Sequence, residues 1–148
     1  MKTIPVSVTC DVTAKVHAQP FRYRVYVNNE LFTERTWIWP DAYLEETLPI
    51  SALAGVYPIR FETVDPDNGR IKVRNYRTDI ESLQDSIAEL EVELIELNKD
   101  HADAETVKRL VDHIEQEKQR LALYKQTRPA RIIMYRGETS VEISNESQ

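Results

Sequence analysis

The sequence has little glycine, cysteine and histidine, and it has no long apolar run. Three glycines, three histidines and one cysteine occur among its 148 residues. The single cysteine, Cys10, excludes an internal disulfide framework and a thiolate metal cluster. No apolar stretch reaches the ~20 residues that a membrane-spanning helix needs, and the start "MKTIPVSVTC" lacks the continuous apolar core of a secretory signal. We therefore expect no membrane partner and a mature chain that begins near Met1.

The histidines and nucleophilic residues form no recognisable catalytic set. His17, His101 and His113 are dispersed, and no serine or cysteine stands in a known nucleophile motif. His101 lies beside Asp100 and Asp103, but this spacing matches no standard metal site, and a solvated turn explains the three residues equally well. The sequence predicts no enzyme, no cofactor and no metal site.

The charge is unevenly distributed along the chain. The net charge is −6, but residues 78–127 hold 13 acidic and 6 basic side chains, which leaves 12 acidic and 13 basic ones elsewhere. Within that segment, residues 79–97 carry seven carboxylates and no lysine or arginine. Such a surface repels a phosphate backbone, so we expect no nucleic-acid partner.

Most of the remaining chain has the period of β-strands. From Ile4 to Val16 every even position is apolar or small and every odd one is polar or proline, which predicts a long strand with one buried face. Asn28 and Asn29 suit a tight hairpin, because asparagine tolerates positive φ. The segment "DPDNG" predicts a further turn. The other strands are expected at residues 21–27, 31–39, 45–50, 56–64, 70–76, 131–135 and 140–144. Seven or eight such strands predict a mainly β fold, an antiparallel immunoglobulin-like sandwich.

Residues 78–128 have a helical period instead. Their apolar residues are spaced alternately three and four apart, which is typical of a coiled-coil seam. The two halves of the seam mirror each other about residue 102, as a chain folded back on itself requires. The predicted seam comprises Ile80, Leu83, Ile87, Leu90, Leu94, Leu97, Val107, Leu110, Ile114, Leu121 and Tyr124, with Glu117 as its one charged position.

A single continuous helix is the competing interpretation, because no glycine or proline interrupts residues 98–105. It would place His101, Ala104 and Lys108 on the seam, out of phase with the second half. We therefore expect an antiparallel coiled-coil α-hairpin of residues 78–128, about 27 Å long, inserted in a β-sandwich of residues 1–77 and 129–148. Thr78 with Glu81 can cap its first helix, and Asp100 and Asp103 its second.

Two sets of apolar residues are candidate contact sites. Trp37 and Trp39 lie two apart and share one strand face; buried, they belong to the core, which we favour, and exposed, they suit a carbohydrate-binding or adhesion module. Ala88, Val92 and Ile95 form an apolar stripe on the side of the first helix that faces away from the seam. This stripe predicts a protein contact. A partner of its acidic surroundings should offer basic residues, and Arg22, Arg24 or Arg74 of a neighbouring copy are candidates.

The run "YRVYVNNELFTERTWIWP", residues 23–40, resembles small virion structural proteins of tailed bacteriophages, in which a strand hairpin precedes a threonine-glutamate-arginine-aromatic run. The resemblance covers mainly residues 3–76 and does not extend to the acidic hairpin. It implies a non-enzymatic β-sandwich located in the virion, as an accessory or decoration protein of the capsid, neck or tail. Its implied partners are other virion proteins, with the major shell protein as a candidate to offer the acidic helix basic groups around an apolar groove, or further copies of itself in a homo-oligomer.

Overall fold

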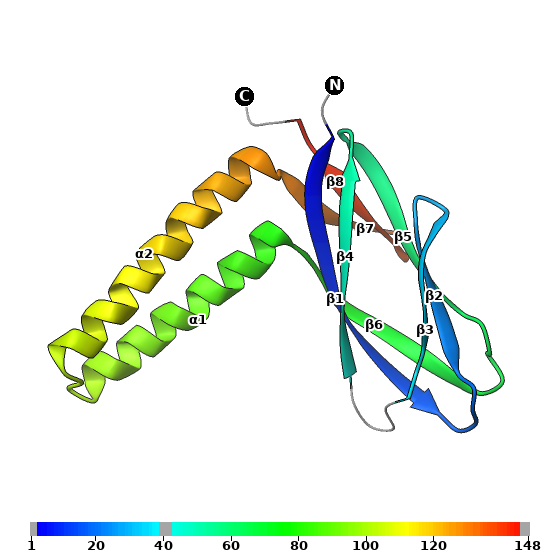
Figure 1. Ribbon diagram of the computed structural model, residues 1–148, viewed down its shortest axis with the longest axis horizontal. Coiled ribbons are helices and arrows are strands. Elements are labelled where there is room, and N and C mark those ends of the chain that lie inside the picture. The colour runs from blue at the N-terminus through cyan, green and yellow to red at the C-terminus, as the bar shows by residue number, and fades with distance from the viewer. Residues whose placement is uncertain (1–2, 39–42, 146–148) are drawn as a thin grey trace.

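The chain forms two antiparallel sheets and two helices (Figure 1). A computed structural model describes residues 3–38 and 43–145. One sheet has three strands in the order β4-β1-β6, and the other has five in the order β3-β2-β5-β8-β7. The strands are β1 (Ile4–Val16), β2 (Arg22–Val27), β3 (Glu30–Thr36), β4 (Tyr43–Ala52), β5 (Gly55–Thr63), β6 (Gly69–Thr78), β7 (Ala130–Tyr135) and β8 (Glu138–Ile143).

The mainly β class predicted from the sequence is confirmed, and every expected strand overlaps an observed one. The largest difference is in β3, which ends at Thr36 instead of continuing to Trp39. Trp39 lies outside the described residues. The turn predicted at Asn28 and Asn29 is confirmed, since both residues have positive φ, 52° and 64°. The chain therefore reverses between β2 and β3 in the conformation that asparagine tolerates best.

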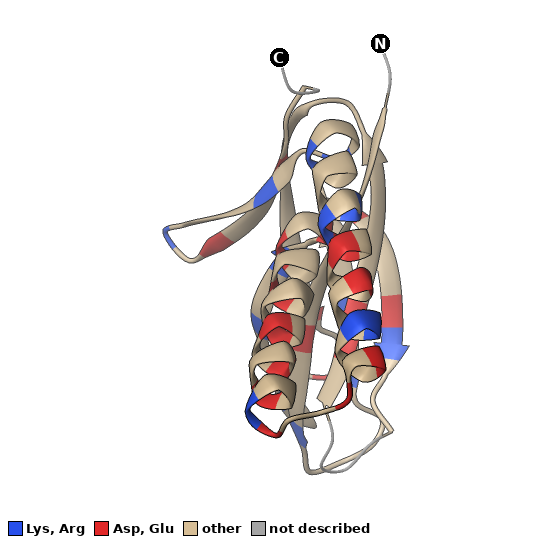
Figure 2. Cartoon of the chain, turned by 90° about the vertical axis from the view of Figure 1, so that its left-hand side faces the viewer, with Lys and Arg blue, Asp and Glu red and all other residues tan. Residues whose placement is uncertain are grey.

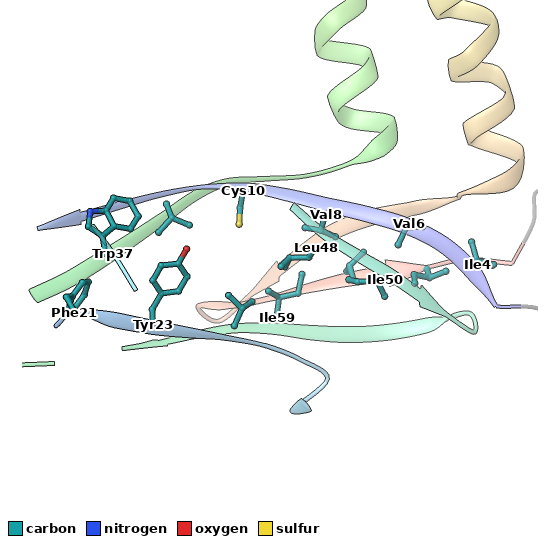
Figure 3. Packing of buried hydrophobic residues seen from close by; sticks show 14 residues of the cluster. Ile4, Val6, Val8, Cys10, Phe21, Tyr23, Trp37, Leu48, Ile50 and Ile59 are labelled. Carbon is teal, nitrogen blue, oxygen red and sulfur yellow. The ribbon is translucent and has the colours of Figure 1, made fainter. Parts of the chain in front are cut away.

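The core lies between the two sheets and follows the alternation of β1. Ile4, Val6, Val8, Cys10 and Val12 are all buried, and they face buried residues of β2, β5 and β8 (Figure 3). Burying one such aliphatic side chain contributes about 1.5–3 kcal/mol. This shared cluster fixes which face of each sheet turns inward.

A β-bulge interrupts the pairing of β6 with β1. The register passes from Thr9↔Arg77 to Asp11↔Arg74, so that two residues of β6 lie opposite Cys10. One of them, Asn75, has φ 55°. The bulge brings the Arg77 guanidinium to 3.3 Å from Asp11 and 3.1 Å from Glu45, across all three strands of the sheet.

The helices α1 (Asp79–Lys99) and α2 (Ala104–Thr127) lie side by side and project from the sheets between β6 and β7 (Figure 1). Thr78 is the N-cap of α1 and accepts from the Glu81 N–H; its hydroxyl also contacts the Glu81 carboxylate, at 3.2 Å. Asp103 is the N-cap of α2. The sequence also predicted Asp100 as a cap of α2. This prediction is wrong, because Asp100 is the C-cap residue of α1. The chain folds back between these residues because His101 adopts φ 55°.

Asp79 anchors the base of the two helices. Its carboxylate accepts a hydrogen bond of 2.9 Å from the Ser7 backbone N–H in β1 and lies 3.6 Å from the guanidinium of Arg128, just after α2. The Arg128 guanidinium also stacks over the Tyr124 ring, at 4.6 Å from its centroid. One carboxylate thus links the start of α1, the end of α2 and the three-stranded sheet.

Candidate interaction surface

The apolar stripe of α1, comprising Ala88, Val92 and Ile95, is exposed. Val92 and Ile95 retain 59% and 55% of their accessible surface. Carboxylates surround them, and α1 has no basic residue before Lys99 in its last turn. Figure 2 shows the acidic residues distributed along both helices. An apolar strip within an acidic surface is a feature that a protein partner can recognise by both contact and charge.

The stripe begins beside a hollow at the base of the helices. Glu81, Asp85 and Glu89 of α1 border this hollow, opposite Asp11 and Arg77 of the three-stranded sheet. Residues seven apart share one side of a helix, so Ala88 follows Glu81 and Val92 follows Asp85 outward along the same side. The stripe therefore extends from the edge of the hollow toward the tip of the hairpin.

Most carboxylates of α1, which we call the arm, form no ion pair. Glu91 lies 3.9 Å from Lys118 of α2, and Asp79 pairs with Arg128 at the base. The other five form no ion pair with any described residue: Glu81, which is hydrogen-bonded to Thr78, and Asp85, Glu89, Glu93 and Glu96. Because these groups repel one another and repel a second identical arm, a basic surface is the favourable partner.

A basic surface lies on the outer face of the three-stranded sheet. Lys15 of β1 and Arg70, Lys72 and Arg74 of β6 are exposed there, and within the described chain none forms an ion pair; we call these four residues the basic ladder. The other two candidates from the sequence are already neutralised. Arg22 binds Asp65 at 2.8 Å and lowers the pKa of that carboxyl, and Arg24 binds Glu34 at 2.7 Å.

The predicted seam residues are all buried or half-buried. Leu83, Ile87, Leu110 and Ile114 are buried and the other seam residues are half-buried, whereas the remaining residues of the two helices are exposed, apart from Asp79, Glu81 and Ser82 in the first turn of α1. Glu117 keeps 17% of its side-chain surface and lies 3.4 Å from Arg120 and 3.7 Å from His113 of its own helix. These contacts hold its carboxylate at the edge of the helix pair.

The sequence reasoning missed a buried carboxylate that connects the two sheets. Glu46 of β4 is 1% exposed and accepts from the Tyr23 hydroxyl at 2.7 Å and from the Arg35 guanidinium at 2.6 and 2.7 Å. The signal for it was its even position two residues before Leu48, on the inward face of the strand. Since Tyr23 and Arg35 belong to β2 and β3, this network ties the five-stranded sheet to β4.

The same region perturbs three ionisable groups. Burial, followed by the charge of Glu46, raises the pKa of the Cys10 thiol from 9.0 to about 12. Burial and the hydrogen bond to Glu46 raise the pKa of Tyr23, and burial raises that of Tyr76. The Cys10 thiol is therefore protonated at neutral pH, which suits an inert core residue.

Trp37 is part of the core. It is fully buried, with its ring centroid 6.5 Å from that of Tyr23 (Figure 3). The prediction that the indole belongs to the core is confirmed for Trp37. Trp39 lies outside the described residues. A buried indole is not open to a sugar ring.

The described residues contain no group of three or more histidine, cysteine or acidic side chains placed to hold a metal ion. His101, with Asp100 and Asp103, lies exposed at the tip of the hairpin. Over the same described ranges, neither helix is apolar enough to span a membrane. Comparisons with protein-family models, with curated proteins and with solved structures found no match.

Proposed function

We propose that this protein is a non-enzymatic structural component that acts by protein–protein assembly, and that the apolar stripe of α1 is one of its contacts. The observation that supports this most directly is the exposure of Val92 and Ile95 on an arm that projects away from the sheets (Figure 1). The arm is held at its base by Asp79, and α1 has acidic residues along its length with no basic residue before Lys99. Such an arm is suited to reach a neighbouring molecule.

We further propose that the assembly is the virion of a tailed bacteriophage. In it this protein would be an accessory or decoration protein associated with the capsid, neck or tail. The support is the resemblance of residues 23–40, which include the β2–β3 hairpin and its asparagine turn. The runner-up is a carbohydrate-binding or adhesion module, which the burial of Trp37 disfavours. Cryo-electron microscopy of purified particles, with the protein located by an antibody against the hairpin, tests the assignment. Absence of the protein from purified particles would refute the virion assignment and leave the assembly role to be tested on the purified chain.

In fold terms, we propose an immunoglobulin-like sandwich of residues 1–77 and 129–148, into which residues 78–128 are inserted as an antiparallel coiled coil. Two face-to-face antiparallel sheets with a shared core support the first part. The low exposure of the seam residues supports the second. The seam would hold the arm rigid, so that its outer surface keeps one shape for a partner.

Replacing Glu117 by leucine tests the coiled-coil pairing. Leucine adds apolar area at a seam position, and the ion pair that is lost joins Glu117 to a largely exposed Arg120 and is weak, so we expect the melting temperature to rise by about 2–5 °C. Circular dichroism at 222 nm measures the change. Glu115→Leu, at an exposed position of α2, is the control and should leave the melting temperature nearly unchanged. A lower melting temperature for Glu117→Leu would contradict the proposed register.

Replacing Val92 and Ile95 together by serine tests the contact. Both side chains are exposed, so the free energy of unfolding should change by less than about 1 kcal/mol. Incorporation into particles should fall severalfold, because the partner loses its apolar contact. The double variant Val111→Ser and Leu123→Ser is a matched control, since it removes two exposed apolar residues from α2. Equal incorporation of the two double variants would mean that the attachment surface is elsewhere.

A further inference from the structure

We infer that the partner of the α1 arm is a second copy of this chain, and that the arm of each copy docks on the basic ladder of the other. This inference rests on the proposed assembly function and names the partner for it. The arm has an exposed apolar stripe and carboxylates that form no ion pair, and the four cations of the ladder form no ion pair with any described residue, although Asp11 lies opposite Arg74 in the strand pairing. The two surfaces are complementary in charge and belong to the same molecule.

The geometry of the ladder suits a helix with regularly spaced carboxylates. Ile71 and Val73 pack against the core, so Arg70, Lys72 and Arg74 alternate with them and point outward. Successive outward residues of a strand are about 6.7 Å apart. Carboxylates three or four residues apart on α1, such as Glu89 and Glu93, rise about 4.5–6 Å along the helix. Several charge pairs can therefore form along one line of contact.

The ladder also has an apolar neighbour for the stripe. Strand pairing places Tyr43 of β4 opposite Thr13 of β1, and Thr13 opposite Lys72 of β6. All three lie on the outer face of the sheet, and Tyr43 is 62% exposed. The Tyr43 ring could contact Val92 and Ile95 of the partner's stripe, while the cations beside the ring face the carboxylates around that stripe. The contact thus combines apolar burial with ion pairs at its rim.

The geometry favours the arm of a second copy over the arm of the same chain. The arm leaves the sheet at Thr78, the opposite end of β6 from Arg70, and runs away from the sheet (Figure 1). Bending it back would break the contacts of Asp79 with Ser7 and Arg128. A two-fold axis lets each copy give one arm and accept one, which closes the assembly as a dimer with two equivalent contacts.

An exchange of charges between the two surfaces tests this arrangement. The ladder variant carries Arg70→Glu, Lys72→Glu and Arg74→Glu, and the arm variant carries Glu89→Lys, Glu93→Lys and Glu96→Lys. Each variant alone has two like-charged surfaces, so we expect its dimer dissociation constant to rise more than about tenfold. An equimolar mixture restores opposite charges at both contacts, so the heterodimer should form. Sedimentation velocity at low salt measures these masses, against 17.3 kDa for one chain.

A matched control for the ladder variant makes the same change of net charge away from both surfaces. Lys108→Glu, Arg109→Glu and Lys125→Glu change three exposed residues of α2 and should leave the dimer intact. Circular dichroism of each variant establishes that it is folded. Added salt should dissociate the wild-type dimer, because screening weakens the exposed charge pairs.

Two results would overturn the inference: a wild-type chain that is monomeric at every protein and salt concentration, or a mixture that stays monomeric although both variants are folded. Arm–ladder cross-links confined to one chain would count against it in the same way. If the inference fails but the Val92 and Ile95 double variant still assembles poorly, the proposed function stands with a different partner. If that variant assembles normally as well, the stripe is not a contact and the attachment surface lies elsewhere on the protein.

Discussion

Replacing Glu46 by alanine is expected to lower the free energy of unfolding by about 3 kcal/mol, since removal of one member of a buried network leaves the other members without a partner. The carboxylate is 1% exposed and accepts bonds from Tyr23 and Arg35. Without it the buried Tyr23 hydroxyl loses this acceptor, and a cavity remains between β2 and β4. Urea unfolding followed by tryptophan fluorescence measures the loss, because Trp37 lies beside Tyr23.

Glu34→Ala is the matched control for this change. Glu34 also binds an arginine, Arg24, at 2.7 Å, but both side chains are more than a third exposed. An exposed ion pair contributes at most about 1 kcal/mol, so this variant should be nearly as stable as the wild type. If the two variants lost equal stability, the network around Glu46 would not be what holds β3 and β4 together.

Stability is also expected to fall steeply above about pH 9. In the folded protein the thiol of Cys10 keeps its proton to about pH 12, and the hydroxyls of Tyr23 and Tyr76 have raised pKa values. The unfolded chain releases these protons at ordinary pKa values, about 8.5–9 for cysteine and 10 for tyrosine. The unfolded state then binds fewer protons than the folded state, so each group lowers the free energy of unfolding by about 1.4 kcal/mol per pH unit. The contribution of these groups is fully present below the unfolded pKa values and is lost as pH rises.

Cys10→Ala isolates one proton of this dependence. The variant is expected to be less stable at pH 7, because a buried side chain becomes smaller. Between pH 9 and 11, however, its free energy of unfolding should fall less steeply than that of the wild type, by the slope of one proton. Urea titrations at intervals across this range give both slopes. Identical slopes would show that the Cys10 thiol ionises equally in the two states.

The features that the sequence predicted correctly are those that depend on residues close together along the chain. The two-residue alternation of Ile4 to Val16 sufficed to predict β1, and Asn28 with Asn29 sufficed for the turn before β3. The three-four spacing after Thr78 sufficed to predict two helices folded back at residue 102. Each signal depends on neighbours along the chain, where backbone sterics and the burial of one face decide the local conformation.

The candidate surface was predictable in its stripe but not in its proposed partner. Helical spacing alone places Val92 and Ile95 away from the seam, on an acidic helix. Among the three arginines named as candidates, however, only the folded chain distinguishes Arg74 from Arg22 and Arg24. The latter two are neutralised by Asp65, which lies 43 residues from Arg22 along the chain, and by Glu34, across the β2–β3 turn.

By itself, then, the sequence determined the mainly β class, the positions of the elements and the excess of carboxylates in the first helix, because periodicity and composition act locally. Only the tertiary structure decided how β4, β1 and β6 pair, how the bulge at Asn75 turns Arg77 toward Asp11, and how Glu46 joins the sheets. It also decided which charges remain without partners. These features depend on the register between strands distant in sequence, and register is set by the packing of a shared core.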